Sequence, residues 1–427
     1  MDANNIAPRI GFAYKVRDKL VLRGGYGIFY AGYESGPWSN PSPAFNPPFF
    51  VSQNFNTPCG APSANPAAGE LDCSILGLSH FADGFPANSL VDPNTPQLLE
   101  LANNIRTPYM QQWHLSTQYE LPHNTMVEIG YGGSRGTKLY TFFDGNQPTP
   151  TTDSTAAYAP RRPDPIIDSG ISVFNSMGNS IYNSLQGRAE KRFSNGFSLL
   201  PSYTWSHSID NESAANRGWS NNSGPRYFAA NPGWERGNSD FDIRQRFVLG
   251  YIVELPFGRG KHFGSGVGGP VNQVIGGWQL SGVTTLSTGN WFTITDGNGN
   301  FSNSSGGQRP DLVPGQNPNG APCVPGTFFN TCAFTDPALG SFGNAGRNIV
   351  LGPGFQVWDV SLLKRFQITE GTRVEFRAEF FNLPNHTNLA PSCAYCTSPV
   401  DLSSSRYGFA TYALAPRQIQ FGLKFYF

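Results

Sequence analysis

The chain ends on Arg417-Gln-Ile-Gln-Phe-Gly-Leu-Lys-Phe-Tyr-Phe427, in which apolar and polar side chains alternate at every second position. A period of two predicts a β-strand with one apolar face and one wet face. This strand also finishes on an aromatic residue of its apolar face. An edge strand of a soluble protein can show the same alternation, so the rest of the chain is needed to distinguish a soluble sheet from a membrane sheet. The apolar face carries Ile419, Phe421, Leu423, Phe425 and Phe427, and the other face carries Gln418, Gln420, Gly422, Lys424 and Tyr426.

The 427 residues have zero formal net charge and few charged side chains. Lys, Arg, Asp and Glu make up 14% of the chain, below the roughly 25% that is typical of soluble domains. Zero net charge gives no basic field, so we expect no nucleic-acid partner. No apolar run reaches the roughly 18 residues of a transmembrane helix, so a membrane role would have to come from strands. The start, Met1-Asp-Ala-Asn-Asn-Ile6, lacks the basic and apolar parts of a signal peptide, and we therefore expect a fragment whose N-terminal part is missing.

Ten further segments alternate in the same way. Several of them form pairs joined by tight turns, of which Ser194-Asn195-Gly196 is the clearest because Asn-Gly favours a hairpin. With the terminal strand they make about eleven strands of the roughly ten-residue length that membrane barrels use. The expected strands are 10–16, 20–30, 113–121, 125–131, 182–193, 197–205, 247–255, 278–286, 357–366 and 373–382.

The links between these strands alternate in length. Short links follow the first, third, fifth and ninth strands, and a moderate Gly-rich link, 256–275, follows the seventh. Short turns on one rim and long loops on the other are typical of an antiparallel meander β-barrel in the outer membrane, with the long loops extracellular. A compact soluble domain does not need several long structureless loops. The expected long links are 31–108, 135–179, 210–242, 289–354 and 383–416.

The two faces of the predicted strands differ in a way that a bilayer explains. Arg373, Glu375, Arg377 and Glu379 alternate with apolar residues, and such a ladder of opposite charges suits a water-filled lumen. A solvated face of a soluble sheet is the alternative, but it leaves the opposite faces, rich in Phe, Tyr, Trp and Leu, unexplained. Lys191 and Lys364 fall on outward faces close to short turns, where we expect them to reach the interface at little cost.

The six cysteines form three local pairs, all in the predicted loops. We expect loop disulfides in an oxidising compartment. The Cys393-Ala-Tyr-Cys396 spacing is also used by zinc sites and redox motifs, but a zinc site usually has a second such pair, and a redox motif an adjoining βαβ pattern. Neither is present in the sequence. The expected pairs are Cys59 with Cys73, Cys323 with Cys332, and Cys393 with Cys396.

No other pattern singles out a catalytic, cofactor-binding or metal-binding residue. The histidines are scattered, and no Gly-x-Ser-x-Gly motif of a nucleophile elbow occurs. Asp296-Gly-Asn-Gly-Asn300 resembles the start of a calcium loop, but Phe301 and Gly307 stand where an EF-hand needs glycine and an acid, so we interpret it as a polar turn. The loop aromatics either stack on sugars or peptides or pack on one another. The histidines are His80, His114, His123, His207, His262 and His386, and the loop aromatics include Trp38, Phe49, Phe50, Trp219, Tyr227, Phe228, Trp234, Phe328 and Phe329.

Several stretches together resemble the barrel of TonB-dependent receptors of the Oar-like type, which carry a carboxypeptidase-regulatory-like domain at the N-terminus. The resemblance implies a 22-stranded barrel with an internal plug, of which residues 1–427 would be the C-terminal part, without the plug and the regulatory-like domain. It also implies that the terminal pattern of Phe421, Leu423, Phe425 and Phe427 is read by the barrel-assembly machinery. The stretches are Asn5-Ile-Ala-Pro-Arg-Ile-Gly-Phe-Ala-Tyr14, Val21-Leu-Arg-Gly-Gly-Tyr-Gly-Ile-Phe-Tyr30, Thr107-Pro-Tyr-Met-Gln-Gln-Trp113, Glu190-Lys-Arg-Phe-Ser-Asn-Gly196, Ser202-Tyr-Thr-Trp-Ser206, Phe342-Gly-Asn-Ala-Gly-Arg-Asn348 and Glu379-Phe-Phe-Asn-Leu-Pro-Asn-His-Thr-Asn388.

The function expected from these observations is the wall and extracellular mouth of an energy-gated pore in the outer membrane of a Gram-negative bacterium. Its partners would be membrane lipid, the assembly machinery, the TonB complex through the missing N-terminal part, and an extracellular ligand such as an oligosaccharide or peptide. We expect no enzyme activity and no cofactor. Two alternatives stay open: a structural, adhesive or secretion-linked barrel without import, and an outer-membrane hydrolase. Half of a larger barrel, standing alone, should form an open curved sheet or a poorly closed barrel.

Overall fold

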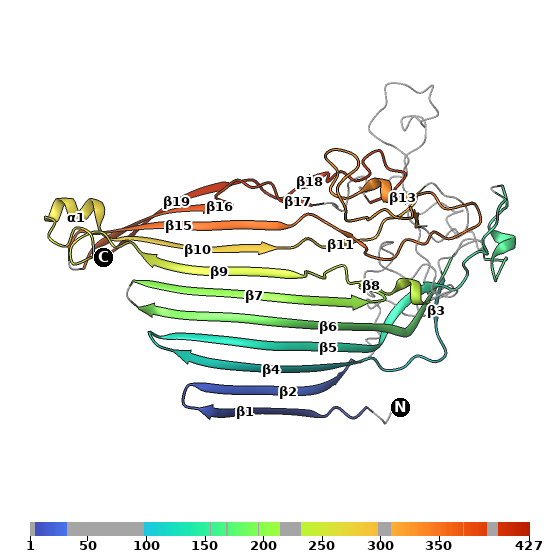
Figure 1. Ribbon diagram of the computed structural model, residues 1–427, viewed down its shortest axis with the longest axis horizontal. Helices are drawn as coiled ribbons and strands as arrows, with labels where there is room; N and C mark the ends of the chain where they lie inside the picture. Colours follow the sequence, from blue (N-terminus) through green and yellow to red (C-terminus); the bar gives the residue numbers. More distant parts are fainter. Residues whose placement is uncertain are drawn as a thin grey trace, which may run out of the picture.

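The computed structural model describes residues 5–31, 98–153, 155–167, 170–194, 196–213, 232–297, 309–369, 371–390 and 400–427. Eleven long strands form one antiparallel sheet in which each strand pairs with the next along the chain (Figure 1). This meander confirms the all-β fold and the strand order predicted from the sequence. The strands are β1 (Arg9–Arg17), β2 (Leu20–Tyr30), β4 (Tyr109–Leu121), β5 (Thr125–Asp144), β6 (Ile171–Ser194), β7 (Phe197–Asp210), β9 (Gln245–Glu254), β10 (Trp278–Ser287), β15 (Phe355–Gln367), β16 (Arg373–Phe381) and β19 (Gln418–Tyr426).

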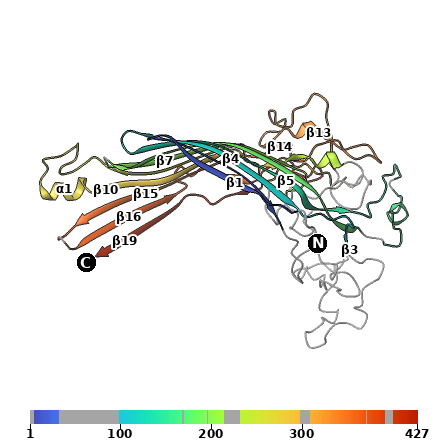
Figure 2. The ribbon, with the colours of Figure 1, turned by 90° about the horizontal axis from the view of Figure 1, so that it is seen from below.

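The sheet is open. Strands β1 and β19 lie at its two ends, and no pairing joins them among the described residues. Seen along its edge, the sheet curves like an arc of a barrel wall (Figure 2). The short turns lie at one end of the strands and the long loops at the other, as the alternating link lengths predict (Figure 1). The open arc agrees with the behaviour expected of half a barrel.

The predicted long link at 135–179 is wrong at both ends. Strand β5 continues to Asp144 and β6 begins at Ile171, so the link between them spans only 145–170. The alternating pattern does not reveal this extension, because the register between β5 and β6 shifts twice around Lys138, whose φ is +56°. Beyond this irregularity, the two strands project past the neighbouring strands into the loop region. There β3 (Leu98–Leu101) adds to β6 in parallel.

The described parts of the long loops contain short elements of their own, so these parts are not structureless. Side chains of the links 289–354 and 383–416 pack into a separate apolar core that includes Ile294, Phe329, Phe334 and Val350. Burying these residues gives the loops a fixed shape. The elements are β8 (Gly237–Asn238), β11 (Trp291–Phe292), β12 (Asp311–Leu312), β13 (Phe334–Thr335), β14 (Val350–Leu351), β17 (Leu389–Ala390), β18 (Tyr412–Ala413) and the 3-10 helices η4 (Ala159–Arg161), η5 (Pro232–Glu235) and η6 (Thr331–Ala333).

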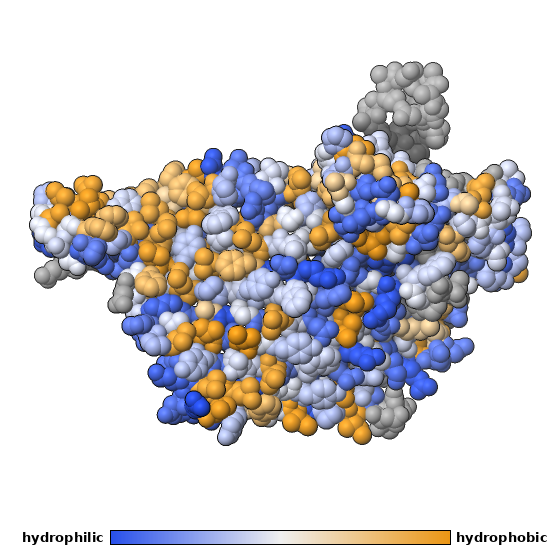
Figure 3. All heavy atoms as spheres, viewed as in Figure 1, coloured by the Kyte–Doolittle hydropathy of each residue, from blue (hydrophilic) through white to orange (hydrophobic). Residues whose placement is uncertain are grey.

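The sheet has one apolar face and one polar face, and the register keeps them apart from strand to strand. For example, Phe421 lies opposite Ala378, which lies opposite Leu362, which lies opposite Leu280. Phe421 is 67% exposed, and rows of exposed large apolar residues continue across the sheet. In Figure 3, apolar residues lie along the strands, and hydrophilic ones are denser towards the loop end. An exposed apolar face of this extent needs a non-aqueous neighbour, which the bilayer supplies.

The one α-helix in the described part of the chain is α1 (Gly269–Ile275), which lies at the short-turn end between β9 and β10 (Figure 1). None of the helices in the described residues has the length and hydrophobicity to span a membrane.

Candidate functional site

The inner face of the wall carries the charge ladder that the sequence predicts. Glu375 accepts a hydrogen bond from Arg377 Nη2 at 2.9 Å, and Arg365 Nε lies 3.5 Å from its other oxygen. Arg377 Nη1 reaches Glu379 at 3.7 Å. Lys424 on β19 pairs in register with Glu375. The ladder therefore presents a continuous charged surface on the side of the sheet opposite to the apolar rows.

The terminal strand presents the expected assembly residues on the apolar face. Phe421 stacks on Phe376 of β16 with ring centroids 6.1 Å apart. Leu423 and Phe425 are exposed, and Phe427 is completely exposed just beyond the end of β19. These positions leave the pattern accessible to another protein. Recognition by the assembly machinery stays a prediction.

The two outward lysines behave differently from one another. Lys191 donates to the carbonyl of Arg192 at 3.2 Å and to the Ser194 hydroxyl at the β6–β7 turn. Lys364 is almost fully buried because α1 covers it, so the sequence-based picture of a side chain reaching freely to water is wrong for Lys364. Its ammonium group donates instead to carbonyls at the end of α1.

A buried arginine joins the extracellular loops. Arg347, whose side chain is 2% exposed, forms an ion pair with the equally buried Asp210 at the end of β7. Its Nη2 donates to the Asp210 carbonyl at 2.8 Å, and its Nε donates to the Glu235 carbonyl at 2.8 Å. The loop before β15 is therefore tied to the loop before β9.

A second buried pair extends this contact. Arg309 Nη2 lies 2.5 Å from the Glu235 carboxylate, and both side chains are nearly inaccessible to water. Gly343 allows its loop to approach the Arg309 backbone closely, because a Cβ there would lie 1.9 Å from the Arg309 carbonyl oxygen. We call Asp210, Glu235, Arg309 and Arg347 the loop clamp.

The pKa values of two acids beside the loop clamp are raised above their ordinary values. Burial raises the pKa of Glu212 to about 8, although the Phe142 N–H donates to its carboxylate at 3.1 Å. Burial also raises the pKa of Asp240, although Asn348 Nδ2 donates to it at 2.6 Å. In both cases the charge of Arg347 opposes the shift. Both acids therefore favour their neutral forms more than a solvated carboxyl does.

Sequence reasoning did not identify the loop clamp. Arg347 lies in the Phe342-Gly-Asn-Ala-Gly-Arg-Asn348 stretch, which drew attention only through a family resemblance. Its partner Asp210 lies 137 residues away, and no periodicity connects the two. The only indication of the loop clamp in the sequence is an arginine that stands between a glycine and an asparagine in a long loop.

The described loop aromatics favour packing over ligand stacking. Phe329 is buried and makes edge contacts with Phe328, Phe334 and Tyr407 at centroid distances of 4.9, 6.0 and 5.3 Å. Trp234 is partly exposed and contacts Phe342 at 6.3 Å. The remaining aromatics named above lie outside the described residues; these are Trp38, Phe49, Phe50, Trp219, Tyr227 and Phe228.

Cys323 and Cys332 are joined by a disulfide in the structure, with their Cα atoms 6.1 Å apart. The bridge closes a short loop next to η6. The other four cysteines, Cys59, Cys73, Cys393 and Cys396, lie outside the described residues.

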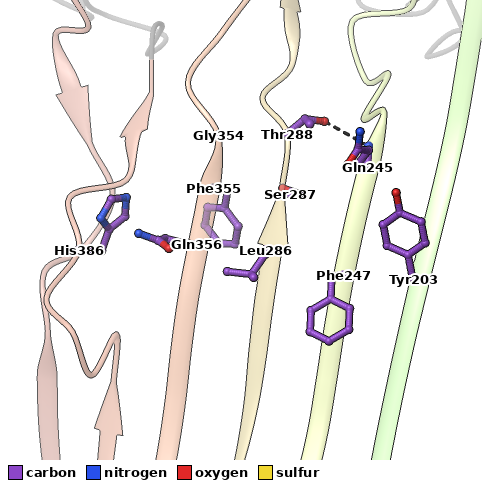
Figure 4. Close-up of a pocket in the computed structure, with 10 residues that line it drawn as sticks. All are labelled: Tyr203, Gln245, Phe247, Leu286, Ser287, Thr288, Gly354, Phe355, Gln356 and His386. Carbon is purple, nitrogen blue, oxygen red and sulfur yellow. Dashed lines mark hydrogen bonds between the residues drawn. The ribbon is translucent and has the colours of Figure 1, made fainter. Parts of the chain in front are cut away.

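A shallow open groove of about 520 Å³ lies near the loop end of β7, β9, β10 and β15 (Figure 4). Its apolar residues Tyr203, Phe247 and Leu286 are register partners in one row of the outer face. The groove therefore faces lipid and does not open into the lumen. Its lining residues are Tyr203, Gln245, Phe247, Leu286, Ser287, Thr288, Gly354, Phe355, Gln356 and His386.

The surroundings of His207 bear on the hydrolase alternative. His207 Nε2 lies 3.1 Å from Asn238 Oδ1 and 2.8 Å from Arg244 Nη2, so its ring faces an amide and a cation. The nearby Ser208 and Ser239 hydroxyls bond to each other at 2.8 Å. This arrangement lacks the contact between a serine and a histidine that a nucleophile triad uses.

No cluster of three His, Cys, Asp or Glu residues that could hold a metal occurs within the described ranges. In the turn that resembles a calcium loop, the Gly297 N–H donates to Asp401 at 2.9 Å, while residues 298–300 lie outside the described ranges. The metal and cofactor predictions therefore rest on the sequence.

One solved structure agrees with the fold, and a second is more distantly similar. The outer membrane transporter YddB from Escherichia coli is similar over 99% of this chain and 41% of its own, with a TM-score of 0.50 and 12% identity. BauA, the ferric preacinetobactin receptor from Acinetobacter baumannii, is similar over 98% and 36%, with a TM-score of 0.43 and 12% identity. The chain thus spans less than half the length of these proteins. No curated protein matches the sequence.

The model of one protein family, described as an outer membrane beta barrel domain, matches residues 1–420. This match covers nearly the whole chain, and it agrees with the meander sheet, the apolar outer face and the charged inner face. It places the protein in the outer membrane. The chain belongs to the outer membrane beta barrel domain family.

Proposed function

We propose that the chain forms part of the wall and extracellular mouth of a TonB-dependent transporter of the Oar-like type. One observation carries the proposal: eleven strands form a lipid-facing arc whose two edges, β1 and β19, are both unpaired in the described structure. In a bilayer an open edge exposes backbone groups that find no hydrogen-bond partner, so the arc needs further strands to close. A larger ring leaves space for a plug, as energy-gated import requires.

The inner wall and the loops support the mouth of such a pore. The ladder around Glu375 provides charged groups along a water-filled passage. The loop clamp fixes two long loops at the extracellular end, because it pairs oppositely charged side chains that are buried together. A mouth with a fixed shape can select a ligand before it enters. The ligand class that we propose is an oligosaccharide or a peptide.

The wall proposal is tested by asking whether the chain alone closes into an eleven-stranded ring. Cysteines are introduced as Phe12→Cys in β1 and Leu423→Cys in β19, and the chain in membranes is treated with bismaleimide cross-linkers of increasing length. We expect no intramolecular product beyond that of each single variant. A short-linker product specific to the double variant would show direct closure and would contradict the proposal.

The transport proposal is tested with the full-length protein in cells that have an active or a deleted TonB. Fluorescent oligosaccharides and peptides serve as probes, and their accumulation in the periplasm is measured. We expect at least one probe class to accumulate only when both TonB and the protein are present. Surface binding without TonB-dependent accumulation would favour the adhesive or structural alternative, which the unpaired edges do not distinguish.

A further inference from the structure

The link between β9 and β10 forms a compact unit at the short-turn end of the wall. We call residues 256–277, which include α1, the α1 foot. Phe257 and Phe263 form a parallel bridge, with ring centroids 5.6 Å apart. Asn272 of α1 accepts a hydrogen bond from the Arg259 N–H at 2.7 Å, which joins the bridge to the helix. The α1 foot therefore has a defined shape.

The α1 foot is attached to the outer side of the wall. Lys364 Nζ donates to the Val274 carbonyl at 3.2 Å and to the Gly276 carbonyl. Trp278 Nε1 donates to the same Val274 carbonyl at 2.9 Å. The register places Lys364 opposite Trp278 and opposite Phe376, in the apolar outward rows. The helix end is thus held by two side chains that point towards lipid.

Further contacts fix the position of the helix. The Lys364 ammonium lies 5.2 Å from the Trp278 ring and 5.0 Å from the Phe366 ring, so aromatic faces surround it. A cation at the C-terminal carbonyls of a helix is favourable, and more so when it is partly buried. Gly277, with φ +70°, then turns the chain into β10; a Cβ there would lie 2.7 Å from the Arg365 carbonyl oxygen.

The α1 foot exposes apolar side chains next to this attachment. Val274 is 68% exposed, and Val271, Phe257 and Phe263 are also among the exposed large apolar residues. Figure 3 shows apolar residues at the left end, over the region of α1, that continue onto the neighbouring strands. The sequence of the α1 foot holds Arg259 and Lys261 and no Asp or Glu, and Lys261 pairs with Glu254 at the end of β9 at 2.8 Å. An exposed apolar surface with only basic charges suits a lipid headgroup region.

We propose that the α1 foot is a membrane anchor that inserts into the periplasmic leaflet of the outer membrane. Its occupant is phospholipid: acyl chains cover Val271, Val274 and the phenylalanines, and phosphates meet Arg259. The surface continues the lipid-facing wall, which supplies the occupant. Amphipathic elements of this kind lie about 5–10 Å below the headgroup boundary. The inference rests on the membrane orientation of the wall and does not depend on transport.

The test places a polarity-sensitive fluorophore on the α1 foot. Val274→Cys is labelled in the full-length protein, folded into vesicles of phosphatidylethanolamine and phosphatidylglycerol with or without brominated acyl chains. The matched control is Asp18→Cys in the β1–β2 turn, on the same rim, where the side chain is 97% exposed. The unsubstituted chain, labelled in parallel, gives the background from native cysteines. Heat-modifiable mobility in gels shows that each variant is folded.

We expect the label at 274 to emit at shorter wavelength and to be quenched several-fold more strongly by brominated lipid than the label at 18. A second label at Val271→Cys should behave like the first. Equal emission and quenching at 274, 271 and 18 would show that the α1 foot lies in water and would overturn the proposal. Shielding of position 274 in native outer membranes, but not in pure lipid vesicles, would assign the surface to a protein partner and would also overturn it.

Discussion

Replacing Arg347 by methionine tests the loop clamp most directly. Arg347→Met preserves much of the side-chain volume but leaves Asp210 buried with no matching charge at the guanidinium position. Removing one member of a buried ion pair costs about 3–5 kcal/mol, against roughly 0–1 kcal/mol for an exposed pair. The lost hydrogen bonds to the carbonyls of Asp210 and Glu235 act in the same direction. We therefore expect local stability in the loops to fall by about 3 kcal/mol or more.

Hydrogen exchange of peptides that cover residues 342–351 measures this change. Since about 1.4 kcal/mol corresponds to a factor of ten, exchange that proceeds through local opening should become about a hundredfold faster. The matched control is Arg236→Met in the same loop cluster, because Arg236 is exposed and its guanidinium donates to the Asn179 side chain at 2.8 Å. Combining Arg347→Met with Asp210→Asn should restore part of the loss. Equal exchange in Arg347→Met and Arg236→Met would refute the account of the loop clamp.

Three further predictions concern the loops and the C-terminus. Because the folded pKa of Glu212 is about 8 and its ordinary value is 4.5, its contribution to loop stability is fully present below pH 4.5 and is lost as pH rises through 8. Proteolysis of the loops should accelerate over that range, and Glu212→Gln should remove the dependence; an unchanged pH profile in the variant would contradict the assignment. Cys323→Ser should lower loop stability by about 2–3 kcal/mol, measured by hydrogen exchange around η6, whereas labelling of Cys323 by maleimide without reduction would show that no bridge exists. Phe427→Ala should reduce the heat-modifiable, folded fraction in outer membranes more than the inward-facing Gln420→Ala does, and equal effects would argue against recognition of the terminal pattern.

The wall could be predicted from the sequence because successive side chains of each strand face two different environments, lipid and water. Side chains on β19 face lipid and the lumen in turn. Apolar residues such as Phe421 therefore alternate with polar residues such as Gln420. The same alternation located ten other strands and their order. It failed at the ends of β5 and β6, where the strands leave the membrane region and the shift at Lys138 interrupts the pattern.

The loop clamp and the α1 foot were not predictable in this way. Both depend on contacts between residues far apart in the sequence, such as Arg347 with Asp210 and Lys364 with Val274. Alternation placed Lys364 on the outer face but said nothing about a helix that covers it. Side chains that stabilise irregular loops do not recur at regular intervals in the sequence. Their contacts are therefore seen only in the three-dimensional structure.

The direction of the edge strands restricts how the wall can close. Neighbours in the sheet are antiparallel, so the first and the eleventh strand, β1 and β19, run the same way. Joining them directly would need a parallel pair, whereas bacterial barrels close with an even number of antiparallel strands. Within the proposed transporter, the rest of the wall must therefore supply an odd number of strands. A ring of 22 needs eleven more, and a complete sequence with an even number of further strands would contradict this closure.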